Sequence, residues 1–361
     1  MARAHKKNTP VYALLLVVAV QFIALGSLLV SGAGTAAVPP AETAAKEEPA
    51  PEEMPAWLTP AEPELEPEPE PVREKEPPAG ERSAREILGG TQIVAHGMGA
   101  VETVSVLNCL EGFQQMYDQG VRVFEVDLRL TRDMQVVLRH DWRGGWQEGI
   151  SEEAVPTLEE FLAAPILDGC TPMSFRDLLL LMEEHPDICV ITDTKFVDAE
   201  IVTVQFAAML ADARELGLSY LFDRMVIQVY SDLMFQVVDS IHHFPHYIYT
   251  LYTAGFGRTE DAFREVADFC AEKGIMGVTM WDYWWEEGYA PLARERGLMT
   301  FVHTVNDPAE ARALLASGIT AIYTDDLTPG ALAEDGQENS DEEHTEKGEQ
   351  INGTDGEDPG Q

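Results

Sequence analysis

Acidic residues stand at the ends of short apolar runs, at a spacing that suits metal binding. Glu125 and Asp127 are two positions apart within the run 121–130, so in a β-strand their side chains share one face. Two carboxylates that point into one cavity repel each other unless a cation lies between them, and their oxygens suit Ca²⁺ or Mg²⁺. Asp193 follows another apolar run and can supply a third ligand. A solvated polar face is the alternative, but the apolar residues between these acids favour a divalent-cation site.

Two histidines end apolar runs of the same kind. His96 follows the first of these runs, and His140 follows the run 135–139. Imidazole titrates near neutral pH, so one ring can accept a proton while the other donates one. A single histidine is more often structural, whereas a pair beside a carboxylate cluster indicates acid–base catalysis. The sequence does not settle which ring is the acid, and His140 is the favoured candidate.

Two basic residues accompany the acidic set. Lys195 lies two positions after Asp193, and Arg129 continues the alternation of the acidic strand. Both side chains can offset the charge of an anionic substrate. For Arg129, an ordinary surface position is an equally good interpretation.

These residues need a scaffold that brings several strand ends together. Short runs rich in β-branched and aromatic residues alternate with longer amphipathic stretches, which indicates parallel strands joined by helices. With about eight such units, the pattern favours a closed (β/α)8 (TIM) barrel over an open sheet, and in barrels the C-terminal strand ends carry the chemistry. The expected strands are 92–95, 121–130, 135–139, 188–192, 225–229, 247–251, 277–280, 300–304 and 321–323. The expected helices are 110–119, 174–184, 199–216, 232–242, 259–273, 286–296 and 307–316.

The composition of both ends is unsuited to a packed core. Residues 1–10 are basic and are expected to stay in the cytoplasm, while 11–33 form a transmembrane helix or, alternatively, a cleaved secretory signal. Residues 34–86 are rich in Pro and Glu and are expected to form a disordered spacer. The barrel is expected over 87–332, followed by a disordered acidic tail over 333–361. This organisation predicts a single-pass protein of the cell membrane with an extracytoplasmic barrel, or a secreted protein if the signal is cleaved.

The charge balance excludes some partners. The chain has 63 acidic and 24 basic residues, and its formal net charge is −39. This excess argues against binding nucleic acid or an anionic membrane surface through a basic patch. It is compatible with holding a divalent cation. The oligomeric state is left open.

The cysteines give little guidance from sequence. The four residues are widely spaced and form no CxxC pair, so a zinc site is not expected. Export permits disulfides, but nothing in the spacing selects a pairing. The four positions are Cys109, Cys170, Cys189 and Cys270.

In chain order, six segments resemble the glycerophosphodiester phosphodiesterase family, within the barrel group that includes phosphatidylinositol-specific phospholipase C. The segments are Ala95-His96-Gly97, 124–133, 137–141, Asp193-Thr194-Lys195, 304–307 and 318–325. The resemblance covers about residues 91–332 and implies a TIM barrel with a metal-assisted site. The roles that it implies are acid–base catalysis by His96 and His140, metal binding by Glu125, Asp127 and Asp193, and phosphate binding by Lys195.

The chain departs from the family pattern at two positions. The family usually has Arg after the first His-Gly, where this chain has Met98. The third acidic ligand is usually Glu, and Asp193 is one methylene shorter. Arg129 is a candidate replacement for the missing arginine.

The resemblance implies metal-dependent hydrolysis of a glycerophosphodiester to an alcohol and glycerol phosphate. A lyase that forms a cyclic phosphate is the nearest alternative. A non-catalytic module that binds an anionic polymer or lipid is another, but both histidines and all three acids are present. The sequence does not choose between a small soluble diester, a lipid and a wall polymer, or between Ca²⁺ and Mg²⁺.

Overall fold

The computed structural model describes residues 72–252 and 255–333. The expected transmembrane segment, most of the expected spacer and nearly all of the expected tail lie outside these residues. Within the described part of the chain, none of the helices is both long and apolar enough to cross a bilayer.

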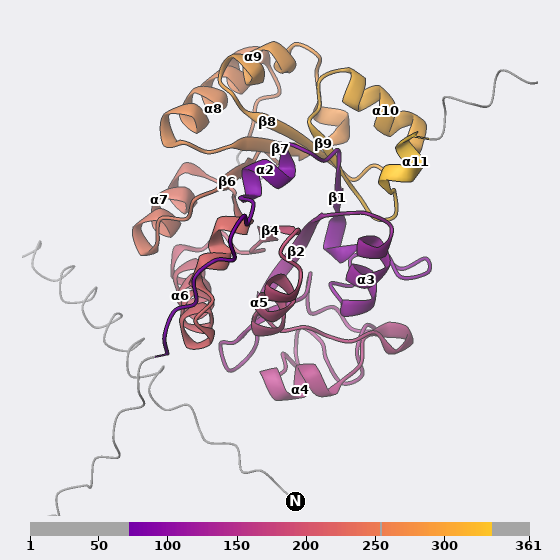
Figure 1. Cartoon of the computed structure of the whole chain (residues 1–361), viewed down its shortest axis with the longest axis vertical. Coiled ribbons are helices and arrows are strands. Elements are labelled where there is room, and N and C mark those ends of the chain that lie inside the picture. The colour runs from indigo at the N-terminus through magenta and orange to yellow at the C-terminus, as the bar shows by residue number, and fades with distance from the viewer. Residues whose placement is uncertain (1–71, 253–254, 334–361) are drawn as a thin grey trace, which may run out of the picture. The chain divides into compact units, whose positions relative to one another are not determined.

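Eight parallel strands close into a barrel surrounded by helices (Figure 1). The ring is closed because β1 pairs with β9 on one side and with β2 on the other, where Ala95 is opposite Phe124. The expected TIM barrel is therefore confirmed. Its strands are β1 (Ile93–Ala95), β2 (Val123–Leu130), β4 (Cys189–Asp193), β5 (Met225–Val229), β6 (Tyr247–Thr250), β7 (Gly277–Trp281), β8 (Met299–His303) and β9 (Ala321–Thr324).

The surrounding helices begin and end where local sequence signals place them. Ser174, Asp198, Thr259 and Asp307 accept hydrogen bonds from backbone N–H groups in the first turn of the helices that they precede. The expected helices match α3 (Leu110–Asp118), α5 (Phe175–Glu184), α6 (Ala199–Leu216), α7 (Asp232–Ile241), α8 (Glu260–Lys273), α9 (Tyr289–Glu295) and α10 (Pro308–Ala316). Within the described residues, three short α-helices were not expected: α2 (Ala84–Leu88), α4 (Leu158–Ala163) and α11 (Pro329–Ala333).

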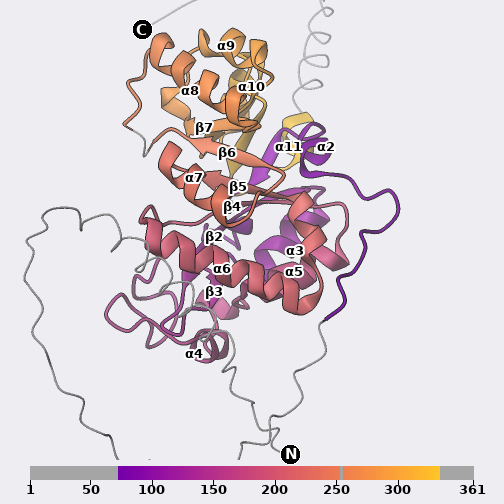
Figure 2. The same ribbon diagram turned by 90° about the vertical axis from the view of Figure 1, so that its left-hand side faces the viewer.

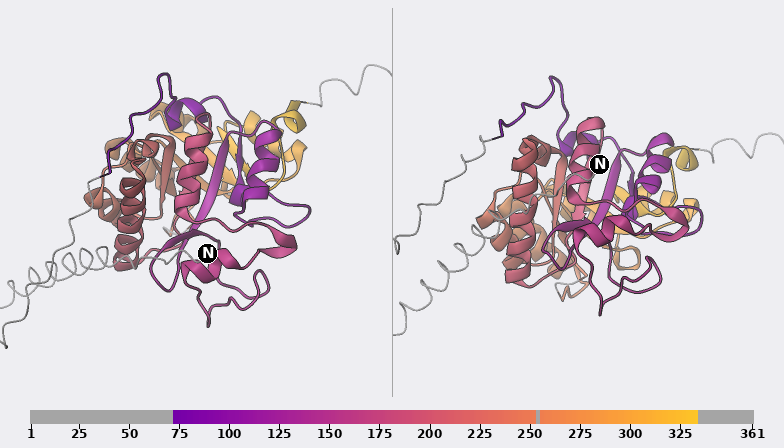
Figure 3. Two further views of the ribbon diagram at one scale, coloured as in Figure 1. Left: turned by 60° about the horizontal axis from the view of Figure 1, so that its bottom comes forward. Right: turned by 90° about the horizontal axis from the view of Figure 1, so that it is seen from below.

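The run 135–139 is not a barrel strand. It contains β3 (Val136–Leu138), which is antiparallel to the end of β2, with Leu128 opposite Leu138. Reading this run as one more strand–helix unit was wrong, because an apolar run carries no information about strand direction. The chain after β3 forms a long excursion with helix α4, outside the ring of helices (Figures 2 and 3).

Helix α2 closes one end of the barrel. Its apolar residues Ala84, Ile87 and Leu88 are buried in a cluster with residues on or beside every barrel strand. Figure 1 shows α2 at the centre of the ring of strands. The segment before it is also ordered, because Glu81 forms an ion pair with Arg224, whose side chain is 1% exposed. Residues 74–86 therefore pack on the barrel, whereas the sequence predicted that they belong to the spacer.

We expect replacement of Glu81 by Ala to destabilise the barrel. The change would leave the guanidinium of Arg224 buried without its carboxylate, although three backbone carbonyls still accept from it. Breaking one side of a buried ion pair costs about 3–5 kcal/mol, which corresponds to a fall in Tm of roughly 6–15 °C. Thermal unfolding measures this shift. Glu183→Gln is the control, because its partner Lys75 is half exposed and the pair contributes little; equal shifts in the two variants would contradict the prediction.

Candidate functional site

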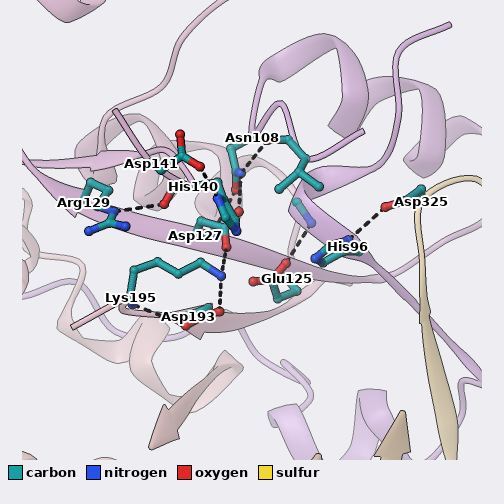
Figure 4. Close-up of polar contacts among 12 residues, drawn as sticks. His96, Asn108, Glu125, Asp127, Arg129, His140, Asp141, Asp193, Lys195 and Asp325 are labelled. Carbon is teal, nitrogen blue, oxygen red and sulfur yellow. Dashed lines mark hydrogen bonds and ion pairs between the residues drawn. The ribbon is translucent and has the colours of Figure 1, made fainter. Parts of the chain in front are cut away.

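Three buried acids meet at one end of the barrel interior. Along β2, Val123, Glu125 and Asp127 share a face, and the first of these lies in the apolar interior cluster while the acids lie nearer the strand's C-terminal end. Asp193 ends β4 directly opposite Asp127 in the strand register. One ligand oxygen from each acid lies within 4.8 Å of the other two (Figure 4). The strand alternation and barrel closure thus build the acidic cluster.

The cluster carries more negative charge than its cationic partner offsets. Lys195 Nζ lies 2.7 Å from Asp127 Oδ1 and 2.5 Å from Asp193 Oδ2. Burial, and next repulsion by Asp127, raise the pKa of Glu125 to about 8. The buried acids therefore fit a divalent cation, which would stabilise all three in the charged form.

Two groups that sequence reasoning missed hold the acids in place. Asn108 Nδ2 donates to Asp127 Oδ2 at 2.7 Å, and the Asp127 backbone N–H donates to Asn108 Oδ1 at 2.8 Å. The Gly97 backbone N–H donates to Glu125 Oε2 at 2.8 Å. Gly97 has φ +52°, and a Cβ there would lie 2.6 Å from Val106 Cα, so only glycine fits. Asn108 follows no strand, so the pattern of polar residues at strand ends does not indicate it.

His96 is held by the carboxylate of Asp325, which directly follows the last strand of the barrel, β9. Its Nδ1 lies 2.9 Å from Asp325 Oδ1, and Asn306 Nδ2 donates to Asp325 Oδ2 at 2.8 Å. Burial acts to lower the pKa of His96, but Asp325 and then the charges of Glu125 and Asp127 outweigh it, raising the pKa to about 9. This ring is therefore set up to be protonated at neutral pH.

His140 lies at the other side of the cluster, just after β3 (Figure 4). Its Nδ1 is 2.8 Å from Asp141 Oδ2, and Arg143 also pairs with that carboxylate. The His140 side chain is 37% exposed, about twice as much as His96. Arg129 Nε donates to the backbone oxygen of His140 at 2.9 Å, and its guanidinium lies over the ring of Phe196.

An aromatic group borders the same end of the barrel. His303 stacks on Trp281 with ring centroids 4.5 Å apart, and Tyr252 contacts both rings. Burial lowers the pKa of His303 to about 3, so this ring is neutral and cannot serve as the acid near pH 7. Tyr283 stacks beyond Trp281 and is 69% exposed.

The structure brings all seven predicted site residues to one region. Lys195 contacts Asp127 and Asp193 directly, while His96, His140 and Arg129 lie around the three acids (Figure 4). Their chemical roles remain predictions. A pocket of about 690 Å³ lies elsewhere in the excursion after β3; it is lined by residues from 145–151 and 165–169, none of them a predicted site residue.

Sequence comparison finds one family match. Residues 105–144 match the model of the glycerophosphoryl diester phosphodiesterase family. The matched segment contains Asn108, Glu125, Asp127, Arg129 and His140. No curated protein matches the chain.

Solved structures share the fold at low sequence identity. A Silicibacter pomeroyi protein assigned as a glycerophosphoryl diester phosphodiesterase has a TM-score of 0.56 and 21% identity, over 70% of this chain and 96% of that one. An Oleispira antarctica phosphodiesterase, in complex with the product sn-glycerol-3-phosphate, has a TM-score of 0.55 and 14% identity, over 68% and 96%. A glycerophosphodiester phosphodiesterase from Agrobacterium tumefaciens has a TM-score of 0.51 and 19% identity, over 67% and 98%. These likenesses support the barrel fold.

Proposed function

We propose that the chain is a member of the glycerophosphodiester phosphodiesterase family, a family of phosphoric diester hydrolases, whose model matches residues 105–144, and that it hydrolyses a glycerophosphodiester to an alcohol and glycerol phosphate with the aid of a divalent cation. The observation that carries the proposal is the buried cluster of Glu125, Asp127 and Asp193 with a histidine on each side. The Oleispira antarctica structure, which holds sn-glycerol-3-phosphate in the same fold, is consistent with this substrate class.

The three acids would hold the cation through their carboxylate oxygens. When bound, a divalent cation supplies charge stabilisation for the phosphoryl oxygens and lowers the pKa of a hydroxyl or water. The ammonium of Lys195 pairs with two of the same carboxylates, so it competes with the cation for them. Asn108 and the Gly97 amide keep Asp127 and Glu125 oriented toward the shared space.

In the proposed reaction, each of the two histidines carries out one proton transfer. His96 is the better acid, in place of His140, which the sequence favoured, because its hydrogen bond with Asp325 and the nearby carboxylates raise the pKa of its ring above neutrality. His140, more exposed and oriented by Asp141, is then the base that takes a proton from the attacking nucleophile. In this scheme His96 protonates the leaving alkoxide, the step that an alkyl ester needs most.

Lys195 and Arg129 are the proposed phosphate-binding cations. Position 98 cannot supply a cation for phosphate binding, because Met98 is fully buried and carries no charge. Arg129 belongs to β2, the strand of Glu125 and Asp127, and its side chain contacts the backbone of His140. It can therefore supply the positive charge that an arginine at position 98 would provide. The guanidinium geometry suits two phosphate oxygens at once.

A product assay tests the proposed function. The full-length protein is incubated with glycerophosphodiesters of different alcohols, with Ca²⁺, with Mg²⁺ and with excess chelator, and the products are identified by mass. We expect glycerol phosphate plus free alcohol, and at least a roughly 100-fold loss of rate in chelator. A cyclic phosphate product would favour the lyase. Binding without turnover would favour the non-catalytic module, and full activity in chelator would remove the metal from the proposal.

The cellular placement is part of the same proposal. Residues 11–33 would anchor the chain in the cell membrane, with the barrel on the extracytoplasmic side. The support is the basic segment before them and the length of the apolar run. Protease protection in intact cells, compared with lysed cells, tests it.

A further inference from the structure

Two of the four cysteines meet beside the acidic site. Cys109 is the residue before α3, and Cys170 lies near the end of the excursion that follows β3. Their sulfur atoms lie within 4.8 Å of each other. Both residues are buried in one apolar cluster with Leu107 and Ile166. The other two cysteines, Cys189 and Cys270, belong to other core clusters.

Backbone contacts hold the two thiols together. Cys109 forms an isolated antiparallel bridge with Pro172, and Leu110 N donates to Thr171 O at 3.3 Å. Glu111 accepts from the backbone N–H and from the hydroxyl of Thr171, both at 2.7 Å. The approach of the two sulfur atoms is therefore built into the fold and does not depend on the thiols themselves.

We propose that Cys109 and Cys170 form a disulfide bond in the mature protein. Two S–H bonds break and one S–S bond forms, while the two electrons and two protons pass to an oxidant of the disulfide class, which becomes two thiols. An extracytoplasmic location would supply such an oxidant. Burial raises the pKa of the Cys109 thiol in the folded protein to about 12 and leaves little thiolate, so the bond would form during folding, when the chain path brings the two sulfur atoms together but before the thiols are buried. This inference rests on the proposed extracytoplasmic placement and not on the proposed hydrolase activity.

A metal site is the competing explanation for the same cluster, since Glu111 also has an oxygen within 4.8 Å of both sulfur atoms. Both oxygens of Glu111 already accept hydrogen bonds from Thr171. That leaves two thiolates, whereas a structural zinc ion takes four protein ligands. The geometry therefore favours a cross-link between the two sulfur atoms.

The cross-link would enclose most of the candidate site. The closed loop from Cys109 to Cys170 contains β2 with Glu125 and Asp127, and it contains His140. Asn108, which holds Asp127 through two hydrogen bonds, is the residue next to Cys109. Oxidation should therefore stabilise the part of the barrel that positions the acids.

The test compares oxidised and reduced full-length protein. The chain is equilibrated with a glutathione redox buffer while unfolded and during refolding, then alkylated under denaturing conditions and digested. We expect one cross-linked peptide pair, Cys109 with Cys170, and alkylation of Cys189 and Cys270 alone. The oxidised form should unfold roughly 5–15 °C above the reduced form.

Variants separate the cross-link from side-chain packing. In Cys109→Ser and Cys170→Ser, the difference in Tm between oxidising and reducing buffer should vanish, whatever the absolute Tm. In the control Cys270→Ser, that difference should persist. Three results would each overturn the proposal. The first is alkylation of all four cysteines after oxidative refolding, and the second is a link that uses Cys189 or Cys270. The third is selective protection of Cys109 and Cys170 by added Zn²⁺ in the wild-type chain.

Discussion

Replacing His96 with alanine is expected to lower kcat on an alkyl glycerophosphodiester by at least about 100-fold, with little change in Tm. The ring would supply the proton that the leaving alkoxide takes up, and general acid–base groups contribute about 10²–10⁴-fold. His140→Ala should show a loss of similar size. The double variant should lose much less than the product of the two, because residues that act as a unit are not additive. His243→Ala is the control, since His243 lies just after α7, is exposed, and forms an ion pair with Asp239 of that helix.

Substrates with different leaving groups distinguish the roles of the two histidines. A nitrophenolate leaves without much protonation, so on a nitrophenyl diester His96→Ala should lose less than it does on the alkyl diester. His140→Ala should lose as much on both substrates. The reverse pattern would exchange the two roles. Near-native turnover of both variants on the alkyl diester would refute the assignment and favour a binding module.

The pH profile of Asp325→Asn gives a readout that a purely structural role would not produce. Asp325 raises the pKa of His96, so removing its charge should lower that pKa. The protonated ring is then lost at lower pH, and the alkaline limb of the kcat profile should move toward neutrality. An unchanged limb would mean that His96 is not the group that titrates there.

Replacing Glu125 with Gln is expected to abolish most divalent-cation binding and to lower turnover by a similar factor. The change removes one charge at nearly constant shape from a cluster of three acids. Calorimetric titration with Ca²⁺ and Mg²⁺ measures the affinity, and the diester assay measures turnover. Glu265→Gln is the control, because Glu265 is exposed on α8. Loss of turnover with unchanged metal affinity would give Glu125 a role other than metal binding.

The same variant should be more stable than the wild type when metal is removed at alkaline pH. The pKa of Glu125 is raised from 4.5 to about 8 by burial and by Asp127, so the folded state binds its proton more tightly than the unfolded state. Its contribution to folding is therefore fully present below about pH 4.5 and is lost as the pH rises through about 8. Gln cannot ionise, so this loss should disappear. Thermal unfolding in chelator across that pH range tests the sign; a variant that is less stable than the wild type at pH 9 would contradict it.

The barrel and most of the site could be predicted because local patterns encode them. The two-residue alternation of β2 places Glu125 and Asp127 on the interior face, and buried strands such as β4 read as continuous apolar runs. The positions of His96 and His140 at the ends of such runs, together with the resemblance to the family pattern, then indicated these two histidines. Each of these inferences uses neighbours within about ten positions.

The missed features all depend on contacts between distant residues. Asp325 meets His96 only after the barrel closes, and the direction of β3 depends on its pairing with β2. Residues 74–86 read as spacer because they are charged and rich in Pro, but Glu81 finds a buried partner in Arg224. The proximity of Cys109 and Cys170 likewise follows from the path of the excursion rather than from their spacing.

The two histidines follow strands of different kinds, and this difference bears on protein engineering. His96 follows a barrel strand directly, whereas His140 follows the antiparallel strand β3, which opens the excursion that ends at α5. The excursion begins and ends beside the barrel, and it supplies none of the eight parallel strands. Residues 142–169 are therefore a candidate cassette for exchange between relatives, and the exchange would leave the proposed metal ligands and His96 in place. Under the proposed function, such chimaeras would test whether the excursion determines which alcohol is accepted, because the barrel would be inherited whole and only the surroundings of His140 would vary.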